Sequence, residues 1–471
     1  MTQIKFGTDG WRAIIGKDFT VDNVARVAEA TAHWLLKNYT QPSVVLGNDT
    51  RFGGKLFTET TCKIFCLHGI KTFLSSNEFI STPMISLGTL QKNANLGVII
   101  TASHNPPAYN GYKLKGPYGG PLLPEKIEEI EQMIPVFTTH NLDKISLEEF
   151  EAKGLIEYID LENMYCEHIE KNFDLTSIRN SGIRFAYDAM FGAGQNVMKR
   201  LFPKAVVLHC DYNPSFLGQA PEPIHKNLQE FSKLIKRSRK LDCGIATDGD
   251  ADRIGLYDNK GNFIDSHHII LLLIKYLHEH KKMTGQVVTA FSVSPKVSKM
   301  CEHFKLNQKV TKIGFKHIAG IMVNEDTLLG GEESGGIAIK GHIPERDGIW
   351  IGLTILENMA KTGKSLQELI ADVYEIVGPF AFERVDLHLQ EDIKNQIVAN
   401  CENNIYTSFG DYKIQRIENV DGYKYFFNED EWFMLRASGT EPVLRNYAQS
   451  NTQKNAFQIL KAVEQTLLQD Q

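Results

Sequence analysis

The sequence lacks the features of a secreted or membrane-spanning chain. Its first residues, MTQIKFGTDGWRAIIG, contain neither the apolar region nor the small-residue cleavage site of a secretory signal. No stretch of the 471 residues approaches the apolar length that a transmembrane helix needs. We therefore predict a cytoplasmic protein that does not bind a membrane.

Cysteine is scarce and forms no disulfide or zinc pattern. The seven cysteines are scattered along the chain and odd in number. Cys62 and Cys66 would share one face of a helix, but no second pair follows at the spacing of a zinc site. These residues are predicted to be buried, reduced thiols.

The chain also has no net positive charge. The formal net charge is −6, whereas a protein that finds nucleic acid through its bulk field is normally basic. A local arginine cluster could still hold a small anionic ligand. The length predicts roughly three or four domains, and the 42% of apolar residues is ordinary for a globular protein.

Short β-branched apolar runs alternate with helical patterns through most of the chain. Runs of this length are typical of parallel strands buried on both faces, and the alternation predicts α/β units. The predicted strands are 43–48, 95–101, 183–188, 205–210, 242–247 and 286–291, and the predicted helices include 22–36, 124–134, 228–240 and 266–280.

The pattern changes near Gly378. From Asp411 onward the runs alternate polar and apolar residues, and a helical pattern over 455–468 follows them. This predicts a smaller α+β module with an antiparallel sheet. The predicted domains are 1–150, 151–254, 255–373 and 374–471.

The first candidate loop, TASHNPPAYNGYK, follows the predicted strand 95–101. Ser103 lies just beyond the strand end, beside His104 and before two prolines that stiffen the turn. It could be a nucleophile or phosphate carrier, or a serine that only caps a turn. The Gly-x-Ser-x-Gly elbow of the α/β-hydrolases is absent.

The second loop, DGDADRIG, follows the predicted strand 242–247. Asp248, Asp250 and Asp252 alternate, so an extended backbone would aim three carboxylates to one side. Three converging oxygens suit Mg²⁺ or Ca²⁺, although a solvated acidic turn is the alternative. The calcium loop of EF-hands does not fit, because Arg253 stands where it needs glycine.

Two further loops could bind a phosphorylated sugar. In GGEESGG, Glu332 and Ser334 could read vicinal hydroxyls, although any glycine-rich turn is an equal alternative. In RASGTEPVLR, backbone N–H groups and polar side chains could cradle a dianion, or the arginines could pair on the surface. The cradle would comprise Arg436, Ser438, Gly439, Thr440 and Arg445.

All four loops, in this order, resemble those of the α-D-phosphohexomutase superfamily, the phosphoglucomutases and phosphomannomutases. FGTDGWR at 6–12 and GFKHI at 314–318 extend the resemblance over essentially the whole chain. It implies three related α/β domains and a C-terminal α+β domain of the TATA-binding-protein-like type, arranged around a central cleft.

The resemblance also implies roles for individual residues. Ser103 would carry the phosphate, and Asp248, Asp250 and Asp252 would bind Mg²⁺ together with a phosphoserine oxygen. Glu332 and Ser334 would read the sugar, and the loop from Arg436 to Arg445 would hold the phosphate that is not transferred. Others would line the transfer site or contact the substrate, namely Arg12, His104, Lys113 (as general acid/base), Arg253, Lys316 and His317.

The implied reaction moves phosphate between C1 and C6 of a hexose through a bisphosphorylated sugar. GEES resembles the glucose-specific enzymes, so glucose 1-phosphate and glucose 6-phosphate are expected, with glucose 1,6-bisphosphate as activator. Arg346, which the resemblance expects to contact the substrate, stands where some members of the family carry lysine, and arginine keeps the charge but changes the geometry. The loop TASHNPP differs from that of phosphoglucosamine mutases.

Other functions remain open at this point. A phosphomannomutase or a dual-specificity enzyme is the first alternative, because one or two contacts can discriminate epimers. A metal-dependent phosphatase would pass the phosphate of Ser103 to water. A sugar-phosphate-binding protein would need no phosphate carrier. The enzyme is expected to be a monomer or weak homodimer.

Overall fold

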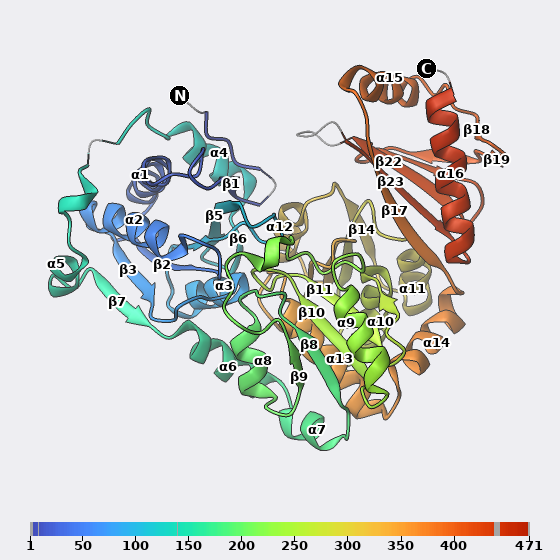
Figure 1. Cartoon of the computed structure of the whole chain (residues 1–471), viewed down its shortest axis with the longest axis horizontal. Helices are drawn as coiled ribbons and strands as arrows, with labels where there is room; N and C mark the ends of the chain where they lie inside the picture. The colour runs from blue at the N-terminus through green and yellow to red at the C-terminus, as the bar shows by residue number, and fades with distance from the viewer. Residues whose placement is uncertain (1–2, 8, 139, 438–442, 470–471) are drawn as a thin grey trace. The chain divides into compact units, whose positions relative to one another are not determined.

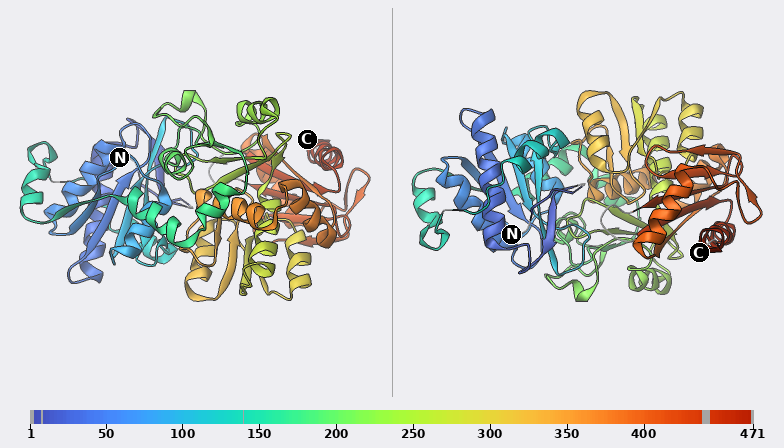
Figure 2. Two further views of the ribbon diagram at one scale, coloured as in Figure 1. Left: turned by 90° about the horizontal axis from the view of Figure 1, so that it is seen from below. Right: turned by 90° about the horizontal axis from the view of Figure 1, so that it is seen from above.

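The computed structural model describes residues 3–7, 9–138, 140–437 and 443–469. The chain divides into two compact units, one of residues 1–288 and 314–370 and one of residues 289–313 and 371–471. Among the described helices, none combines the length and the apolar character that crossing a membrane requires. The elements can be followed in Figure 1 and from two further directions in Figure 2.

The larger unit begins with a sheet in the order β1-β5-β4-β2-β3-β7, with β6 added to β5. β2, β3, β4 and β7 run parallel, whereas β5 is antiparallel to β4 and to β1. Its strands are β1 (Trp11–Ile14), β2 (Ser43–Asn48), β3 (Lys71–Ser75), β4 (Leu96–Ile100), β5 (Tyr109–Gly116), β6 (Gly120–Pro121) and β7 (Ile156–Ile159). β7 pairs with β3 of this sheet although it lies beyond residue 150, where the first predicted domain ends. The four predicted domain ranges stay predictions.

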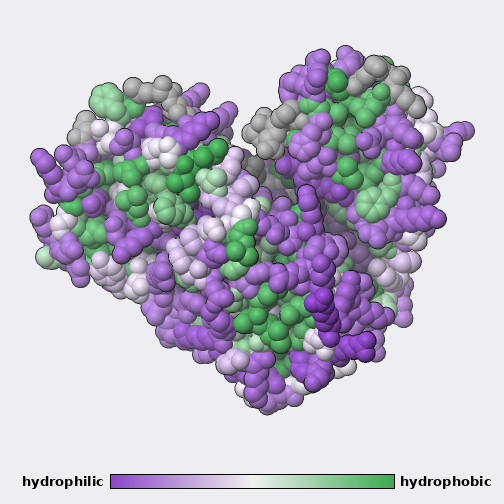
Figure 3. Space-filling view, in the orientation of Figure 1, coloured by the Kyte–Doolittle hydropathy of each residue, from purple (hydrophilic) through white to green (hydrophobic). Residues whose placement is uncertain are grey.

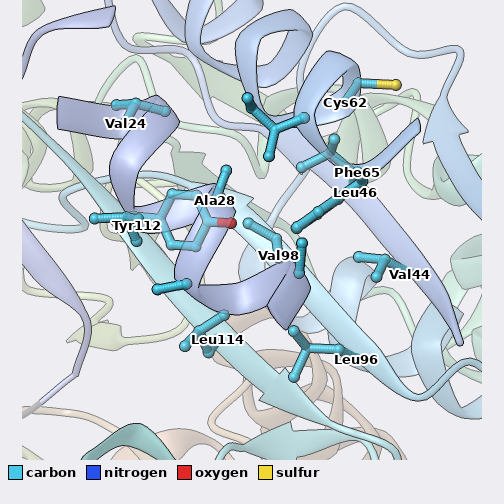
Figure 4. Packing of buried hydrophobic residues seen from close by; sticks show 14 of the residues in the cluster. Val24, Ala28, Val44, Leu46, Cys62, Phe65, Leu96, Val98, Tyr112 and Leu114 are labelled. Atoms are coloured by element: carbon cyan, nitrogen blue, oxygen red, sulfur yellow. The ribbon is translucent and has the colours of Figure 1, made fainter. Parts of the chain in front are cut away.

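Helices cover both faces of this sheet. The helices of the segment are α1 (Val21–Asn38), α2 (Gly54–Leu67), α3 (Thr82–Gln91), α4 (Pro124–Gln132) and α5 (Leu147–Ala152). Val44 and Leu46 of β2 pack in one apolar cluster with Ala28 of α1 and Phe65 of α2, as Figure 4 shows. The next side chain along β2, Val45, lies on the opposite face beside α3, where Gly88 approaches it. Because β2 is buried on both faces, its residues form an apolar run without alternation.

The second sheet has the order β12-β11-β10-β8-β9. β8, β9 and β10 are parallel, and β11 and β12 are antiparallel additions. The elements are α6 (Leu161–Asn172), α7 (Leu175–Asn180), β8 (Phe185–Asp188), α8 (Gln195–Leu201), β9 (Val206–Leu208), α9 (Gln229–Ser238), β10 (Cys243–Thr247), β11 (Ile254–Asp258) and β12 (Phe263–Ile264). The sequence prediction of buried parallel strands at 183–188 and 242–247 is confirmed. The predicted strand at 205–210 corresponds to β9, but its expected burial is wrong, because β9 lies at the edge of the sheet and Val206 and Val207 are exposed.

The elements from residue 266 to residue 377 are divided between the larger and the smaller unit. The larger unit contains α10 (Ser266–Glu279), α12 (Phe315–Asn324), α13 (Gly348–Thr362) and the antiparallel pair β15 (Thr327–Gly331) and β16 (Ile337–Ile339). The smaller unit contains α11 (Lys296–Phe304) and β14 (Gln308–Thr311), while β13 (Gln286–Ala290) and α14 (Leu366–Val377) extend across the boundaries.

The smaller unit is built on an antiparallel sheet in the order β17-β23-β22-β21-β20. Phe433 and Leu435 of β22 pack with Ile459 and Val463 of α16 on one face, and Trp432 and Met434 form a cluster on the other. The elements are β17 (Ala381–His388), α15 (Glu391–Glu402), β18 (Ser408–Phe409), β19 (Tyr412–Lys413), β20 (Arg416–Glu418), β21 (Tyr423–Phe426), β22 (Trp432–Ala437), β23 (Val443–Ser450) and α16 (Gln453–Gln469). The predicted change to an α+β module is confirmed.

The seven cysteines are all buried and free, as the sequence predicts. The face in Figure 3 is mostly hydrophilic, with apolar residues in small groups.

Candidate active site

Ser103 is held in a buried loop just past the end of β4. Its backbone has a φ of +52°, a conformation that is uncommon for residues other than glycine. The Ser103 N–H donates to Thr101 Oγ1 at 2.9 Å, and its carbonyl accepts from Arg51 Nη2 at 2.6 Å. The residue is only 1% exposed. These contacts fix the direction in which the hydroxyl points.

The aspartate loop at the end of β10 meets the Ser103 loop. Asp248, Asp250 and Asp252 are fully buried, and one oxygen from each lies within 4.8 Å of the others. The expected extended backbone is wrong, because Gly249 and Asp250 form a turn and Ala251 has a φ of +57°. The turn, and not strand alternation, brings the carboxylates together.

The hydroxyl of Ser103 is directly bonded to this cluster. Ser103 Oγ donates to Asp248 Oδ2 at 2.7 Å, and His104 Nδ1 lies 3.3 Å from the same hydroxyl. A Cβ on Gly249 would lie 2.4 Å from the Ser103 carbonyl oxygen. Only glycine therefore permits the two loops to approach so closely.

The three carboxylates fit a hard divalent cation. Burial raises the pKa of Asp248 well above its usual range, and Asp250 and Asp252 raise it further. Among the described side chains, Asp250 Oδ1 and Asp252 Oδ1 are buried with no hydrogen-bond partner. Because an unpaired buried carboxylate oxygen is costly, oxygens left free in this way suit Mg²⁺ coordination.

Lys113, from β5, neutralises part of the same cluster. Its Nζ lies 2.8 Å from Asp250 Oδ2, 3.3 Å from Asp252 Oδ2 and 2.8 Å from Asp9 Oδ2. Burial by itself would lower the pKa of Lys113, but these three carboxylates raise it above its ordinary value. The side chain is thus a buried ammonium group.

Arg346, from the PERDG segment, joins several loops. Its Nη2 lies 2.5 Å from Asp9 Oδ2 and 2.6 Å from Asp252 Oδ2, and Nη1 lies 3.7 Å from Glu332 Oε2. Burial opposes ionisation of Asp9, but its cationic neighbours, led by Lys113, lower its pKa well below the usual range. Arg346 is therefore tied to carboxylates of the protein itself.

The predicted sugar-reading residues lie in the same unit. Glu332 is buried and accepts a hydrogen bond from the Gly314 N–H at 3.0 Å. Burial raises the pKa of Glu332 to about 7, although Arg346 opposes this shift. Ser334 is half-buried, as are Lys316 and His317, which lie in the first turn of α12.

The remaining candidates Arg12, Arg253 and His104 lie in or contact the serine and aspartate loops. Arg12 Nη1 donates to Asn105 Oδ1 at 2.7 Å in the serine loop. The Arg253 N–H donates to Asp248 Oδ1 at 3.0 Å, and its guanidinium lies 3.7 Å from Glu222. Burial lowers the pKa of His104 well below its usual range, and nearby cations, led by Arg253, lower it further. His104 is therefore a neutral imidazole beside the serine hydroxyl.

Only part of the predicted phosphate cradle is described. Arg436 and Arg445 are paired across β22 and β23 in the smaller unit, and Arg436 Nε donates to Asp421 Oδ1 at 3.3 Å. Ser438, Gly439 and Thr440 lie outside the described residues.

Sequence reasoning missed three side chains that organise the site. Asp9 binds both Lys113 and Arg346, Arg51 binds the serine loop, and Thr82 Oγ1 donates to Asp250 Oδ2 at 2.5 Å. Asp9 lies inside FGTDGWR and Arg51 lies just after β2. The position of Arg51 after a strand end was an available signal, whereas Asp9 precedes β1 and Thr82 begins α3.

Four family models match the chain. They are described as phosphoglucomutase/phosphomannomutase alpha/beta/alpha domain I (residues 3–138), domain II (163–261), domain III (265–377) and C-terminal domain (399–465).

Relatives and solved structures match almost the whole chain. A phosphoglucomutase/phosphomannomutase of Thermococcus kodakarensis is 29% identical over 462 residues, which is 97% of this chain and 96% of that protein. A phosphoglucosamine mutase of Shouchella clausii is 28% identical over 98% of this chain and 99% of its own length. A crystal structure from Thermus thermophilus, assigned as a phosphomannomutase, has a TM-score of 0.87 and 29% identity and covers 99% of both chains.

Proposed function

Since the chain belongs to the phosphoglucomutase/phosphomannomutase family, we propose that it transfers phosphate between C1 and C6 of a hexose phosphate through phosphoserine at Ser103. One observation carries this assignment. Ser103 Oγ is bonded to Asp248, within a cluster of three buried carboxylates that retains two unpartnered oxygens.

The proposed transfer breaks the bond between phosphorus and Ser103 Oγ and forms one between phosphorus and a sugar hydroxyl oxygen. The hydroxyl proton passes to a base in the site, and the released serine oxygen takes up a proton. A second transfer, from the other end of the bisphosphorylated sugar, restores phosphoserine. Phosphoryl transfer of this kind depends mainly on positioning and charge neutralisation.

The side chains around Ser103 supply these two requirements. Mg²⁺ held by Asp248, Asp250 and Asp252 would neutralise phosphoryl charge. Lys113, as an ammonium group, can donate a proton to a leaving sugar oxygen, and it accepts one only after losing its own. Neutral His104, 3.3 Å from Ser103 Oγ, is a second group that can exchange a proton with the serine.

We further propose that the hexose phosphate is a glucose phosphate. The GEES sequence of the sugar loop favours glucose phosphates, and Glu332 offers a buried carboxylate to sugar hydroxyls. The Shouchella clausii relative supports a second candidate, glucosamine phosphate. Mannose phosphate is the third, because the Thermococcus kodakarensis relative is described as acting in both classes.

A direct test compares the three 1-phosphates as substrates of the full chain with Mg²⁺ and glucose 1,6-bisphosphate. We expect the highest kcat/KM with glucose 1-phosphate, no turnover after removal of divalent metal with EDTA, and recovery on adding Mg²⁺. Ser103→Ala should abolish turnover, while Ser146→Ala, which changes the half-buried N-cap of α5, should retain it. A higher kcat/KM with glucosamine 1-phosphate would replace glucose as the assigned substrate. Turnover by Ser103→Ala would reject the proposal that Ser103 carries the phosphate.

Hydrolysis distinguishes a mutase from a phosphatase. Isolated phosphoenzyme should lose its phosphate much more slowly to water than to glucose 6-phosphate, since a mutase must exclude water from its phosphoserine. Equal rates with and without sugar would favour the phosphatase alternative.

A further inference from the structure

A second cluster of possible metal ligands lies among the helices of the first sheet. Glu29 of α1, His68 at the end of α2 and His140 each offer one atom, and these three atoms lie within 4.8 Å of one another. His68 Nε2 contacts Glu29 Oε2, and His140 Nε2 lies 2.8 Å from Glu29 Oε1. None of these residues belongs to the candidate active site.

The charge of Glu29 makes this cluster unusual. The residue is only 5% exposed, and its sequence neighbours Val27, Ala28 and Ala30 belong to the apolar core. Among the described residues, no lysine or arginine forms an ion pair with Glu29, and both oxygens face imidazoles. A buried carboxylate is costly unless it is paired or coordinates a metal, and a divalent cation between these groups would supply the missing positive charge.

His33 adds a possible fourth ligand. It follows Glu29 by one helical turn on α1, which places both side chains on one face of the helix. The His33 ring lies 5.0 Å from the His68 ring, centroid to centroid, and the side chain is exposed.

The segment that carries His140 is fastened to both helices. Arg26 Nε, from α1, donates to the Pro135 carbonyl at 2.7 Å. Lys63 Nζ, from α2, donates to the Leu142 carbonyl at 3.0 Å. The helices α1 and α2 pack against each other (Figure 1). The bonds from Arg26 and Lys63 hold the chain on both sides of His140 to these two helices.

We propose that Glu29, His68 and His140 bind Zn²⁺, with His33 or water in the fourth position. Zinc takes imidazole nitrogen and carboxylate oxygen in four-coordinate sites at about 2.0–2.2 Å. Imidazole selects zinc over the hard cations that the aspartate loop suits. Bound zinc would join α1, α2 and the segment around His140, and would thereby stabilise the first domain without taking part in phosphate transfer.

The test uses the full chain and zinc chloride alone as the probe. After equilibrium dialysis against zinc with excess Mg²⁺, elemental analysis should find one zinc per chain. His140→Ala and His68→Ala should each lower zinc affinity at least about tenfold, whereas His303→Ala, an exposed histidine of α11, should leave it unchanged. Zinc should also raise the Tm of the wild type and of His303→Ala, but not that of His140→Ala.

Three results would overturn the proposal. Either the absence of bound zinc or equal zinc affinity in the wild type and His140→Ala would leave a hydrogen-bonded cluster without a metal. The third is loss of the zinc in Asp252→Asn but not in His140→Ala, which would assign it to the aspartate loop. His140 is a half-exposed residue outside the helices, so His140→Ala should fold even if the more deeply placed variants do not.

Discussion

Arg51 Nη2 lies 2.6 Å from the carbonyl oxygen of Ser103 and 2.6 Å from that of Asn105. Nη1 of the same side chain donates to the carbonyls of Pro106 and Tyr109, at 3.0 Å each. One buried guanidinium therefore satisfies four acceptors of the loop that carries the candidate phosphoserine.

We expect Arg51→Lys to lower kcat at least about tenfold while KM changes little. Lysine keeps the charge but cannot reach four carbonyls in fixed directions. Each buried carbonyl left without a partner costs about 1–3 kcal/mol, so the Tm should fall as well. Steady-state kinetics and thermal unfolding check both effects. Unchanged kcat in a folded variant would show that the loop holds its shape without these bonds.

Gly249→Ala should reduce both activity and stability. The new Cβ would lie 2.4 Å from the Ser103 carbonyl oxygen, a backbone atom that cannot move without moving the serine. Overpacking of this kind costs about 1–3 kcal/mol.

Gly320→Ala is the matched control for that substitution. Gly320 lies in α12, and its Cβ would meet its nearest neighbour, Leu123 Cδ2, at 3.6 Å, which is an ordinary contact. Alanine should therefore be neutral or stabilise the helix by roughly 0.5–1 kcal/mol. Chemical denaturation of the two variants measures the contrast, and equal effects would contradict the close-contact argument.

Arg346→Lys should lower kcat/KM by about an order of magnitude. The guanidinium pairs with Asp9 and Asp252 at once and reaches toward Glu332. A single ammonium cannot reproduce this geometry. The double variant Asp9→Asn/Arg346→Lys should lose less than the sum of the single variants, because the residues are in contact. Strict additivity would mean that they act independently.

His168 should make the protein sensitive to mild acid. Burial, aided by His342, lowers the pKa of His168 to about 4. The unfolded chain, with an ordinary imidazole pKa near 6.5, therefore binds more protons between pH 6.5 and 4. Stability from this residue is present above pH 6.5 and is lost as the pH falls through that window.

His168→Gln tests this assignment. The difference in Tm between pH 7.5 and pH 5 should be smaller in the variant than in the wild type. The exposed control His303→Ala should keep the wild-type difference. An unchanged difference in His168→Gln would mean that other groups cause the acid sensitivity.

The regular parts of the fold could be predicted because local patterns determine them. The apolar run at 43–48 corresponds to β2, and the pattern at 266–280 corresponds to α10 at Ser266–Glu279. The order of domain types could also be predicted from the four loops. The antiparallel placement of β5 beside β4 could not be predicted from the sequence, because strand direction depends on pairing with other segments of the chain.

The residue types of the candidate site could be proposed from the sequence, but their geometry could not. The alternation of Asp248, Asp250 and Asp252 indicated a metal loop, yet the left-handed conformation of Ala251 has no sequence signature. Asp9 and Arg51 escaped notice because their importance comes from contacts with residues far along the chain.

All seven thiols are buried, so their modification by a thiol reagent requires local opening of the structure. Cys243 lies on β10, the strand that leads directly into the aspartate loop, and burial raises its pKa to about 12. A maleimide can reach this sulfur only when the strand opens. The rate at which a maleimide modifies Cys243 in the native protein therefore measures how often this strand opens, and no engineered cysteine is needed.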